Sequence, residues 1–298
     1  MQLHQLDYFV AVAEHRHFTR AAEARDVAQP TLSQQIAALE RSLGVRLLDR
    51  NPGNIELTAA GQELLPIARR MLAEAENARR AMRELTDLKR GQVRLGATPS
   101  LCTGLVPDIV GEYHRRHPGV AIVITESGSR DLQSALTDGT LDLALLVDSR
   151  AQDDPGLATE PLFVEELVVI SSRDQPPPTR RARMRISELR TKQLVMFREG
   201  YDLREATLGA CRAEGFEPTF AVEGGEMDAV LGLVAAGLGV AVVPSTVVTD
   251  RFRVTPLASP GLARTVQVAR RSGVELSRAA AELADAIGAY AETALTSV

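Results

Sequence analysis

The chain has 298 residues, of which 45% are hydrophobic and 24% are charged, an ordinary composition for a globular protein with room for two domains. No apolar run is long enough to cross a membrane, and the N-terminus lacks the basic leader and cleavage site of a signal peptide, so we expect a cytoplasmic protein without a membrane partner. The two cysteines, Cys102 and Cys211, exclude a disulfide framework.

The net charge of −5 is unevenly distributed along the chain. Residues 1–90 hold 13 arginines and lysines against 12 acidic residues, a net charge of +1, whereas residues 91–298 carry −6. Charge alone therefore does not indicate nucleic-acid binding, and any such function has to rest on the placement of particular side chains.

Residues 18–44 predict two short helices joined by a tight turn. The second helix starts near Pro30, because proline suits the first helical turn. One apolar stripe follows at helical spacing: Leu32, Ile36, Leu39 and Leu43. Amides and hydroxyls gather at the start of this helix, as on a helix that reads DNA bases. A plain three-helix bundle with a polar surface is the alternative.

Residues 45–61 predict a β-hairpin directly after the helix pair. Two short apolar runs, VRLL and IEL, flank the turn-forming sequence RNPGN. A hairpin in this place makes a winged helix-turn-helix.

The N-terminal third resembles the LysR-type transcriptional regulators over LHQLDYFVAVAEHRHFTRAAEARDVAQPTLSQQIAALERSLGVRLLDR and the following LTAAG. The resemblance implies a double-stranded DNA operator as partner and leaves RNA polymerase open as a further one. It implies these DNA-facing residues, the last of them on the wing: Gln29, Pro30, Thr31, Ser33, Gln34 and Arg50. The family wing often carries a second arginine where this chain has Gly53.

Residues 59–90 predict one long helix, with Thr58 as its N-cap and Gly91 as its stop. Apolar residues alternate in steps of four and three along it: Leu64, Ala68, Met71, Ala75, Ala78, Met82 and Leu85. Such a seam predicts a homodimer, and hence an operator that is an approximate inverted repeat. The resemblance points to a homotetramer, and a single long surface helix is the alternative.

After Gly91, short β-rich runs alternate with helical ones, which predicts an α/β domain with a largely parallel sheet. The resemblance implies a two-lobed, periplasmic-binding-protein-like effector domain. We therefore expect a winged helix-turn-helix over 1–58, a linker helix over 59–90 and an effector domain over 91–298. Lobe I is expected over about 91–162 and 267–298, and lobe II over about 163–266.

Ligands of such domains lie at the C-terminal ends of strands and the N-termini of helices. We predict a small-molecule effector, such as an organic acid, between the lobes, at these residues: Thr98, Pro99, Ser100, Leu101, Ser129, Gly200, Tyr201 and Gly224. A serine before a helix also serves as a simple N-cap. Arg204 is expected to pair with a ligand carboxylate or with one of its acidic neighbours Glu199, Asp202 and Glu205.

The segment GYDLREATLGACRAEGFEP also resembles the peroxide-sensing branch of the family, in which two cysteines nine residues apart form a regulatory disulfide. Here the second is Cys211, but Asp202 stands in place of the first. A carboxylate cannot form a disulfide, so thiol sensing through Cys102 or Cys211 is the alternative rather than the main hypothesis.

No enzyme motif is present: the chain has no GxSxG, HExxH, glycine-rich phosphate loop or CxxC pair. We therefore expect no catalytic activity, no metal and no cofactor. Whether the effector activates or represses transcription stays open at this point.

Overall fold

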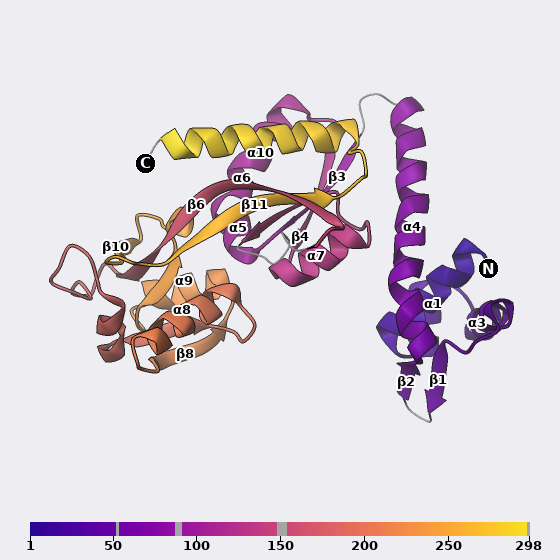
Figure 1. Ribbon diagram of the computed structural model, residues 1–298, viewed down its shortest axis with the longest axis horizontal. Coiled ribbons are helices and arrows are strands. Elements are labelled where there is room, and N and C mark those ends of the chain that lie inside the picture. Colours follow the sequence, from indigo (N-terminus) through magenta and orange to yellow (C-terminus); the bar gives the residue numbers. More distant parts are fainter. Residues whose placement is uncertain (52–53, 87–90, 148–153, 297–298) are drawn as a thin grey trace. The chain divides into compact units, whose positions relative to one another are not determined.

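The computed structural model describes the chain except for residues 52–53, 87–90, 148–153 and 297–298 (Figure 1). It forms two compact units. The first is Met1–Gly91 with Ser134–Leu141, and the second is Gln92–Gln133 with Asp142–Val298. In the described residues, no helix has the length and hydropathy to cross a membrane.

The N-terminal unit has the winged helix-turn-helix order that the sequence predicts (Figure 1). Its elements are α1 (Leu3–His15), α2 (Phe18–Ala24), α3 (Gln29–Leu43), β1 (Leu48–Asn51), β2 (Asn54–Leu57) and α4 (Ala59–Thr86). β1 and β2 pair antiparallel as the predicted hairpin. Helices α1 to α3 and the first turns of α4 share one core.

Local signals explain where these helices begin and end. The His17 ring accepts the backbone N–H of Thr19 through Nδ1 at 3.2 Å and so caps α2. Pro30 lies in the first turn of α3, where its missing N–H has no helical partner. Gly44 ends α3 with a φ of 74°, a left-handed conformation that glycine adopts without strain.

Helix α4 is held against the hairpin by a close backbone approach. Thr58 is its N-cap, as predicted, because the Thr58 Oγ1 accepts the N–H of Gly61 at 3.1 Å. A Cβ on Gly61 would lie 2.1 Å from the carbonyl oxygen of Leu47, so only glycine fits there. The predicted stop at Gly91 adjoins residues outside the described part.

The second unit contains two lobes that share long strands. Lobe I holds β3 (Gln92–Ala97), α5 (Pro99–Gly104), α6 (Val106–Arg116), β4 (Ala121–Glu126), the first part of α7 (Ser129–Thr137), β5 (Leu143–Val147) and α10 (Arg278–Thr296). Lobe II holds η2 (Ile186–Thr191), β7 (Gln193–Phe197), α8 (Asp202–Ala213), β8 (Thr219–Gly225), α9 (Met227–Ala235), β9 (Ala241–Pro244), η3 (Ser245–Val247) and β10 (Phe252–Pro256). β6 (Leu157–Ser172) and β11 (Ala263–Arg271) run between them (Figure 1).

The main sheet is mixed, which corrects the expectation of a largely parallel one. Its order is β10-β6-β11-β5-β3-β4, with β9 also paired to β6. β3 pairs parallel with β4 and β5, but every pairing made by β6 and β11 is antiparallel. β6 pairs with β11 over 157–166 and with β9 and β10 over 167–172, so the strands that run between the lobes are the antiparallel component.

Each lobe has its own hydrophobic core. In lobe I the core includes Leu95 on β3 and Leu143 on β5, and in lobe II it includes Val195 on β7 and Val230 on α9. The helical segment that follows β3 is divided into α5 and α6 at Leu105. This break puts a separate short helix, α5, directly after β3.

Candidate DNA-binding surface and effector pocket

The first turns of α3 present polar side chains to solvent. Gln29, Pro30, Thr31 and Gln34 are exposed, and Ser33 is half-buried. They are exposed because the opposite side of α3 is the buried one, where the predicted apolar residues Leu32, Ile36 and Leu39 pack. The side chain of Arg50 and all of Gly53 lie outside the described residues.

Gln35, next to the predicted DNA-facing residues, has a structural role. Its Oε1 accepts the Nε2–H of Gln5 on α1 at 3.1 Å, which ties the two helices together. Glu40, further along α3, accepts the backbone N–H of Leu47 at 2.8 Å and so positions the hairpin. These contacts fix the orientation of α3 while leaving its N-terminal turns free.

The apolar seam of α4 divides into two parts. Ala68 is fully buried in the core of its own unit and is not available to a partner, contrary to expectation, whereas Leu64 packs against that core and is half-buried. Beyond them, Met71 and Met82 are 37% and 59% exposed. Ala75 is half-buried and Ala78 is exposed, while the side chain of Leu85 is not described.

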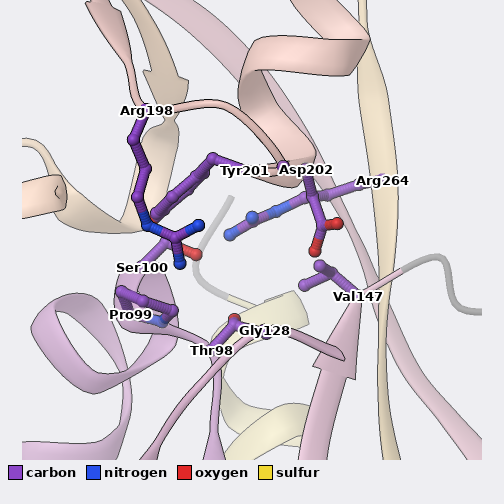
Figure 2. A pocket seen from close by; sticks show the side chains of 10 residues that line it. Thr98, Pro99, Ser100, Gly128, Val147, Arg198, Tyr201, Asp202 and Arg264 are labelled. Atoms are coloured by element: carbon purple, nitrogen blue, oxygen red, sulfur yellow. The ribbon is translucent and has the colours of Figure 1, made fainter. Parts of the chain in front are cut away.

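A pocket lies between the two lobes of the second unit (Figure 2). Lobe I supplies the ends of β3 and β5, and lobe II supplies the loop before α8. The pocket is lined by Thr98, Pro99, Ser100, Gly128, Val147, Arg198, Gly200, Tyr201, Asp202 and Arg264. Its volume of about 20 Å³ admits one or two water-sized groups, so a bound molecule must be compact or must part the lobes.

The structure brings five of the eight predicted effector residues together in this pocket: Thr98, Pro99, Ser100, Gly200 and Tyr201. Leu101 does not line it, because its side chain is fully buried in the lobe I core. Gly224 is exposed on β8 and Ser129 is buried on α7, and neither is a lining residue. Ser129 reaches the pocket indirectly, through a hydrogen bond from its Oγ to Asp202 at 3.2 Å.

Arg264 is a pocket residue that sequence reasoning missed. It lies on β11 directly opposite Glu165 on β6, and its Nε donates to Glu165 Oε2 at 2.8 Å. The side chains of Glu165 and Arg264 are 1% and 6% exposed, so this ion pair is buried. Glu165 also accepts the N–H of Thr246 at 3.2 Å. The cross-strand register puts these charges together across 99 residues of chain, which local patterns do not reveal.

Three buried polar atoms of the pocket residues have no hydrogen-bond partner in the described part of the chain. They are Thr98 Oγ1, the Tyr201 hydroxyl and Arg264 Nη2. Arg264 Nη2 lies 2.7 Å from Glu165 Oε2, close enough for an ion pair, but it is not aligned to donate to that oxygen. Unsatisfied buried polar groups are rare in proteins, and three at one pocket favour a polar occupant.

Arg198 and Tyr201 form the lobe II wall. The Tyr201 ring stacks on Phe197 with centroids 4.6 Å apart, and the Arg198 guanidinium lies 5.8 Å from the Tyr201 centroid. Arg198 also pairs with Glu226. Burial raises the pKa of Tyr201 above its usual range, so its hydroxyl stays protonated and can donate a hydrogen bond.

Asp202 supplies the carboxylate of the pocket. Burial raises its pKa above the ordinary aspartate value, and this effect outweighs the hydrogen bond from Ser129 and the nearby positive charges of Arg264, Arg130 and Arg198. Figure 2 shows its carboxylate and the guanidinium groups of Arg198 and Arg264 pointing toward the middle of the pocket.

The two cysteines do not have the character of redox sensors. Burial is the main cause that raises the pKa of Cys102 to about 12 and the pKa of Cys211 to about 11, so both are thiols at neutral pH. Cys211 is fully buried in the lobe II core, and Cys102 packs against the lobe I core. These surroundings do not favour the thiol-sensing alternative.

Arg204 has a structural role rather than a ligand role. Its Nη2 pairs with Glu223 on β8 at 3.0 Å and its Nη1 donates to the carbonyl oxygen of Phe197 at 2.8 Å. The expectation of an acidic partner is therefore right in kind, but the partner is Glu223 and not one of the neighbours in sequence. Within the described ranges, no group of three histidine, cysteine or acidic side chains is arranged to hold a metal ion.

A winged helix-turn-helix joined by a long helix to a two-lobed α/β domain with a polar pocket defines a DNA-binding regulator with a ligand-binding domain. Two family models match the chain: a bacterial regulatory helix-turn-helix protein of the lysR family over residues 3–62, and a LysR substrate binding domain over residues 86–292. The chain belongs to the LysR family of DNA-binding transcriptional regulators.

Individual relatives cover nearly the whole chain. The transcriptional dual regulator GltC of Bacillus subtilis is 33% identical, over 94% of each chain. A full-length OxyR of Pseudomonas aeruginosa with a cysteine-to-aspartate substitution is 31% identical, with a TM-score of 0.70 over 97% of this chain and 98% of the other. Full-length CbnR in complex with its target DNA is 25% identical, with a TM-score of 0.69 over 96% and 99% of the chains.

Proposed function

We propose that this LysR-type regulator is controlled by a small polar effector that binds in the pocket between the lobes. The observation that carries the proposal is the set of three buried polar atoms, on Thr98, Tyr201 and Arg264, that have no hydrogen-bond partner in the described part of the chain. Each such group costs about 1–3 kcal/mol when it is left unsatisfied. A bound ligand that accepts hydrogen bonds from these three groups removes that cost. The same three groups therefore contribute both to the affinity for the ligand and to the selection of ligands that can accept these bonds.

Binding in this pocket is positioned to change the relation between the lobes. Thr98 and Ser100 belong to lobe I, whereas Tyr201 and Asp202 belong to lobe II. A ligand that contacts both lobes favours one separation of the lobes and shifts the population toward it. We propose that this shift changes how the DNA-binding units engage the operator, and that RNA polymerase in the cytoplasm responds to the change.

The test is a thermal-melt screen of the full-length protein against small metabolites. A ligand at about a hundred times its dissociation constant adds ~2.7 kcal/mol of stability. Thr98→Val and Tyr201→Phe each remove one unpartnered oxygen, so they should reduce the ligand-induced shift without harming the free protein. Ser171→Ala is the matched control, since its buried hydroxyl also lacks a partner in the described residues but lies outside the pocket. A ligand whose shift survives both pocket variants would refute the site.

We also propose that Gln29, Thr31, Ser33 and Gln34 contact the operator, on the strength of their position at the start of α3. Gln34→Ala should weaken binding to the operator more than binding to random DNA, because base contacts carry the specificity. Gln62→Ala is the control, an exposed glutamine on α4. Equal losses on operator and random DNA would reject the assignment. For Arg50 we propose a contact of the wing with the DNA backbone or minor groove.

For the oligomer we propose a homodimer through the exposed part of the α4 seam. Met71 and Met82 are large apolar side chains that a partner helix would cover. Replacing both by aspartate should halve the mass seen by light scattering. An unchanged mass would contradict the role of this helix.

A further inference from the structure

Asp202 differs from the other charged groups of the pocket in having no counter-ion. Its Oδ2 accepts a hydrogen bond from Ser129 Oγ at 3.2 Å. Over the residues that the structure describes, no arginine, lysine or histidine nitrogen lies within the 4.0 Å of an ion pair with it. Its partner is therefore one neutral hydroxyl, although the surroundings remove much of its water.

The two arginines of the pocket, by contrast, already have carboxylate partners. Arg264 pairs with Glu165 behind the pocket wall, and Arg198 pairs with Glu226. Asp202 is therefore the charged lining residue without an ion-pair partner in the described part of the chain, although the positive charges of Arg264, Arg130 and Arg198 lie near it. Because both lining arginines already pair with carboxylates, a ligand with a positive group of its own offers Asp202 the partner that a purely anionic ligand cannot.

The pocket also offers donors for a negative group. The hydroxyls of Thr98 and Tyr201 and the Nη2 of Arg264 are buried and without hydrogen-bond partners in the described part of the chain. Hydroxyl and guanidinium donors match the oxygens of a carboxylate. The pocket thus combines a site for a cation with a site for an anion.

We infer that the effector is a compact zwitterion of the α-amino acid class, whose ammonium group pairs with Asp202 and whose carboxylate accepts from Thr98, Tyr201 and Arg264. The inference rests on the proposed function, because it names the ligand of that pocket. The ammonium takes the place of the Ser129 hydroxyl at Asp202. Binding therefore replaces a hydrogen bond between α7 of lobe I and α8 of lobe II.

The size of the pocket limits how this ligand binds, and the burial of Asp202 favours its ammonium group. A pocket of about 20 Å³ admits one or two water-sized groups, so the ammonium and carboxylate of an amino acid fit only when the lobes part around them. Burial raises the pKa of Asp202, which means that its negative charge is poorly compensated in the free protein. An adjacent ammonium supplies the missing compensation.

The test uses the full-length protein and pairs of probes that differ in the amino group. The twenty L-α-amino acids are screened by thermal melt, and alanine, glutamate, leucine and phenylalanine are compared with their 2-oxo acids by calorimetric titration. The variants are Asp202→Asn and, as a matched control, Asp131→Asn, which removes an exposed aspartate outside the pocket lining. Ser129→Ala is added because it removes the group that the ammonium displaces.

The inference expects at least one amino acid to bind at least tenfold more tightly than its 2-oxo acid. Asp202→Asn should abolish that preference, Asp131→Asn should keep it, and Ser129→Ala should raise the affinity for the amino acid. The inference is overturned if no amino acid binds, if the 2-oxo acid binds equally well, or if Asp202→Asn keeps the preference. A 2-oxo acid that binds as tightly as its amino acid, and whose binding is lost in Thr98→Val, would overturn the zwitterion alone. Ligands whose affinity is unchanged by Thr98→Val and Tyr201→Phe would overturn the pocket itself.

Discussion

The buried ion pair between Glu165 and Arg264 should be needed for the stability of the second unit. The pair joins β6 and β11, and its side chains are 1% and 6% exposed. Arg264→Met leaves the Glu165 carboxylate buried with the Thr246 contacts as its remaining partners. Removing one member of a buried pair costs about 3–5 kcal/mol, because the other charge stays out of water. For a unit of this size the melting temperature should fall by roughly 6–20 °C.

The double variant Glu165→Gln, Arg264→Met separates the effect of charge from that of packing. Glutamine keeps an oxygen for the Thr246 N–H and removes the unpaired charge, so the double variant should be more stable than Arg264→Met alone by about 2 kcal/mol or more. The assay is scanning calorimetry of the full-length protein, with the transition of each unit followed separately. The reasoning would be refuted if Arg264→Met lowered the stability by less than about 1 kcal/mol, or if the double variant were less stable than Arg264→Met.

Three further perturbations test other parts of the structure. Asp202→Asn should raise the melting temperature at neutral pH, because burial raises the pKa of Asp202 and its ionised form therefore costs stability. The gain should shrink as the pH falls toward the ordinary aspartate pKa, and a gain equal at every pH would contradict this. Hydrogen peroxide should leave operator affinity unchanged in a gel-shift assay, since burial raises the pKa of Cys102 to about 12 and of Cys211 to about 11, and a loss of affinity would revive thiol sensing. Gly61→Ala should lower the stability of the N-terminal unit by about 1–3 kcal/mol in the same calorimetry because its Cβ meets a backbone oxygen, whereas Gly209→Ala, with open space around it, should not destabilise the protein.

Local patterns in the sequence were sufficient to predict the helices and the hairpin of the N-terminal unit. The apolar stripe of α3, the turn-forming residues of the hairpin and the Thr58 cap each act within a few residues. The same holds for most strands and helices of the second unit, whose periodicity is local. The prediction of a largely parallel sheet was wrong, because strand direction depends on which segments of β6 and β11 pair over long separations.

The residues that line the pocket also separate into those that local patterns predict and those that only long-range contacts bring in. Thr98, Ser100 and Tyr201 could be predicted, because they follow strands and precede helices in the order of the chain. Arg264 could not be predicted, because its partner Glu165 is brought to it by the register between β6 and β11. The role of Asp202 could not be predicted either, because its partner Ser129 reaches it only where α7 approaches α8.

The seam of α4 is a further case, in which periodicity did not separate the buried positions from the exposed ones. Periodicity identifies the apolar side of the helix, but only packing decides that Ala68 is covered by its own unit while Met71 and Met82 stay exposed. The sequence by itself determined most of the elements, the family and the general place of the pocket, because these follow from short-range spacing. The tertiary structure decided the sheet topology, the burial and the charge balance of the pocket, because these depend on contacts between residues far apart in the chain.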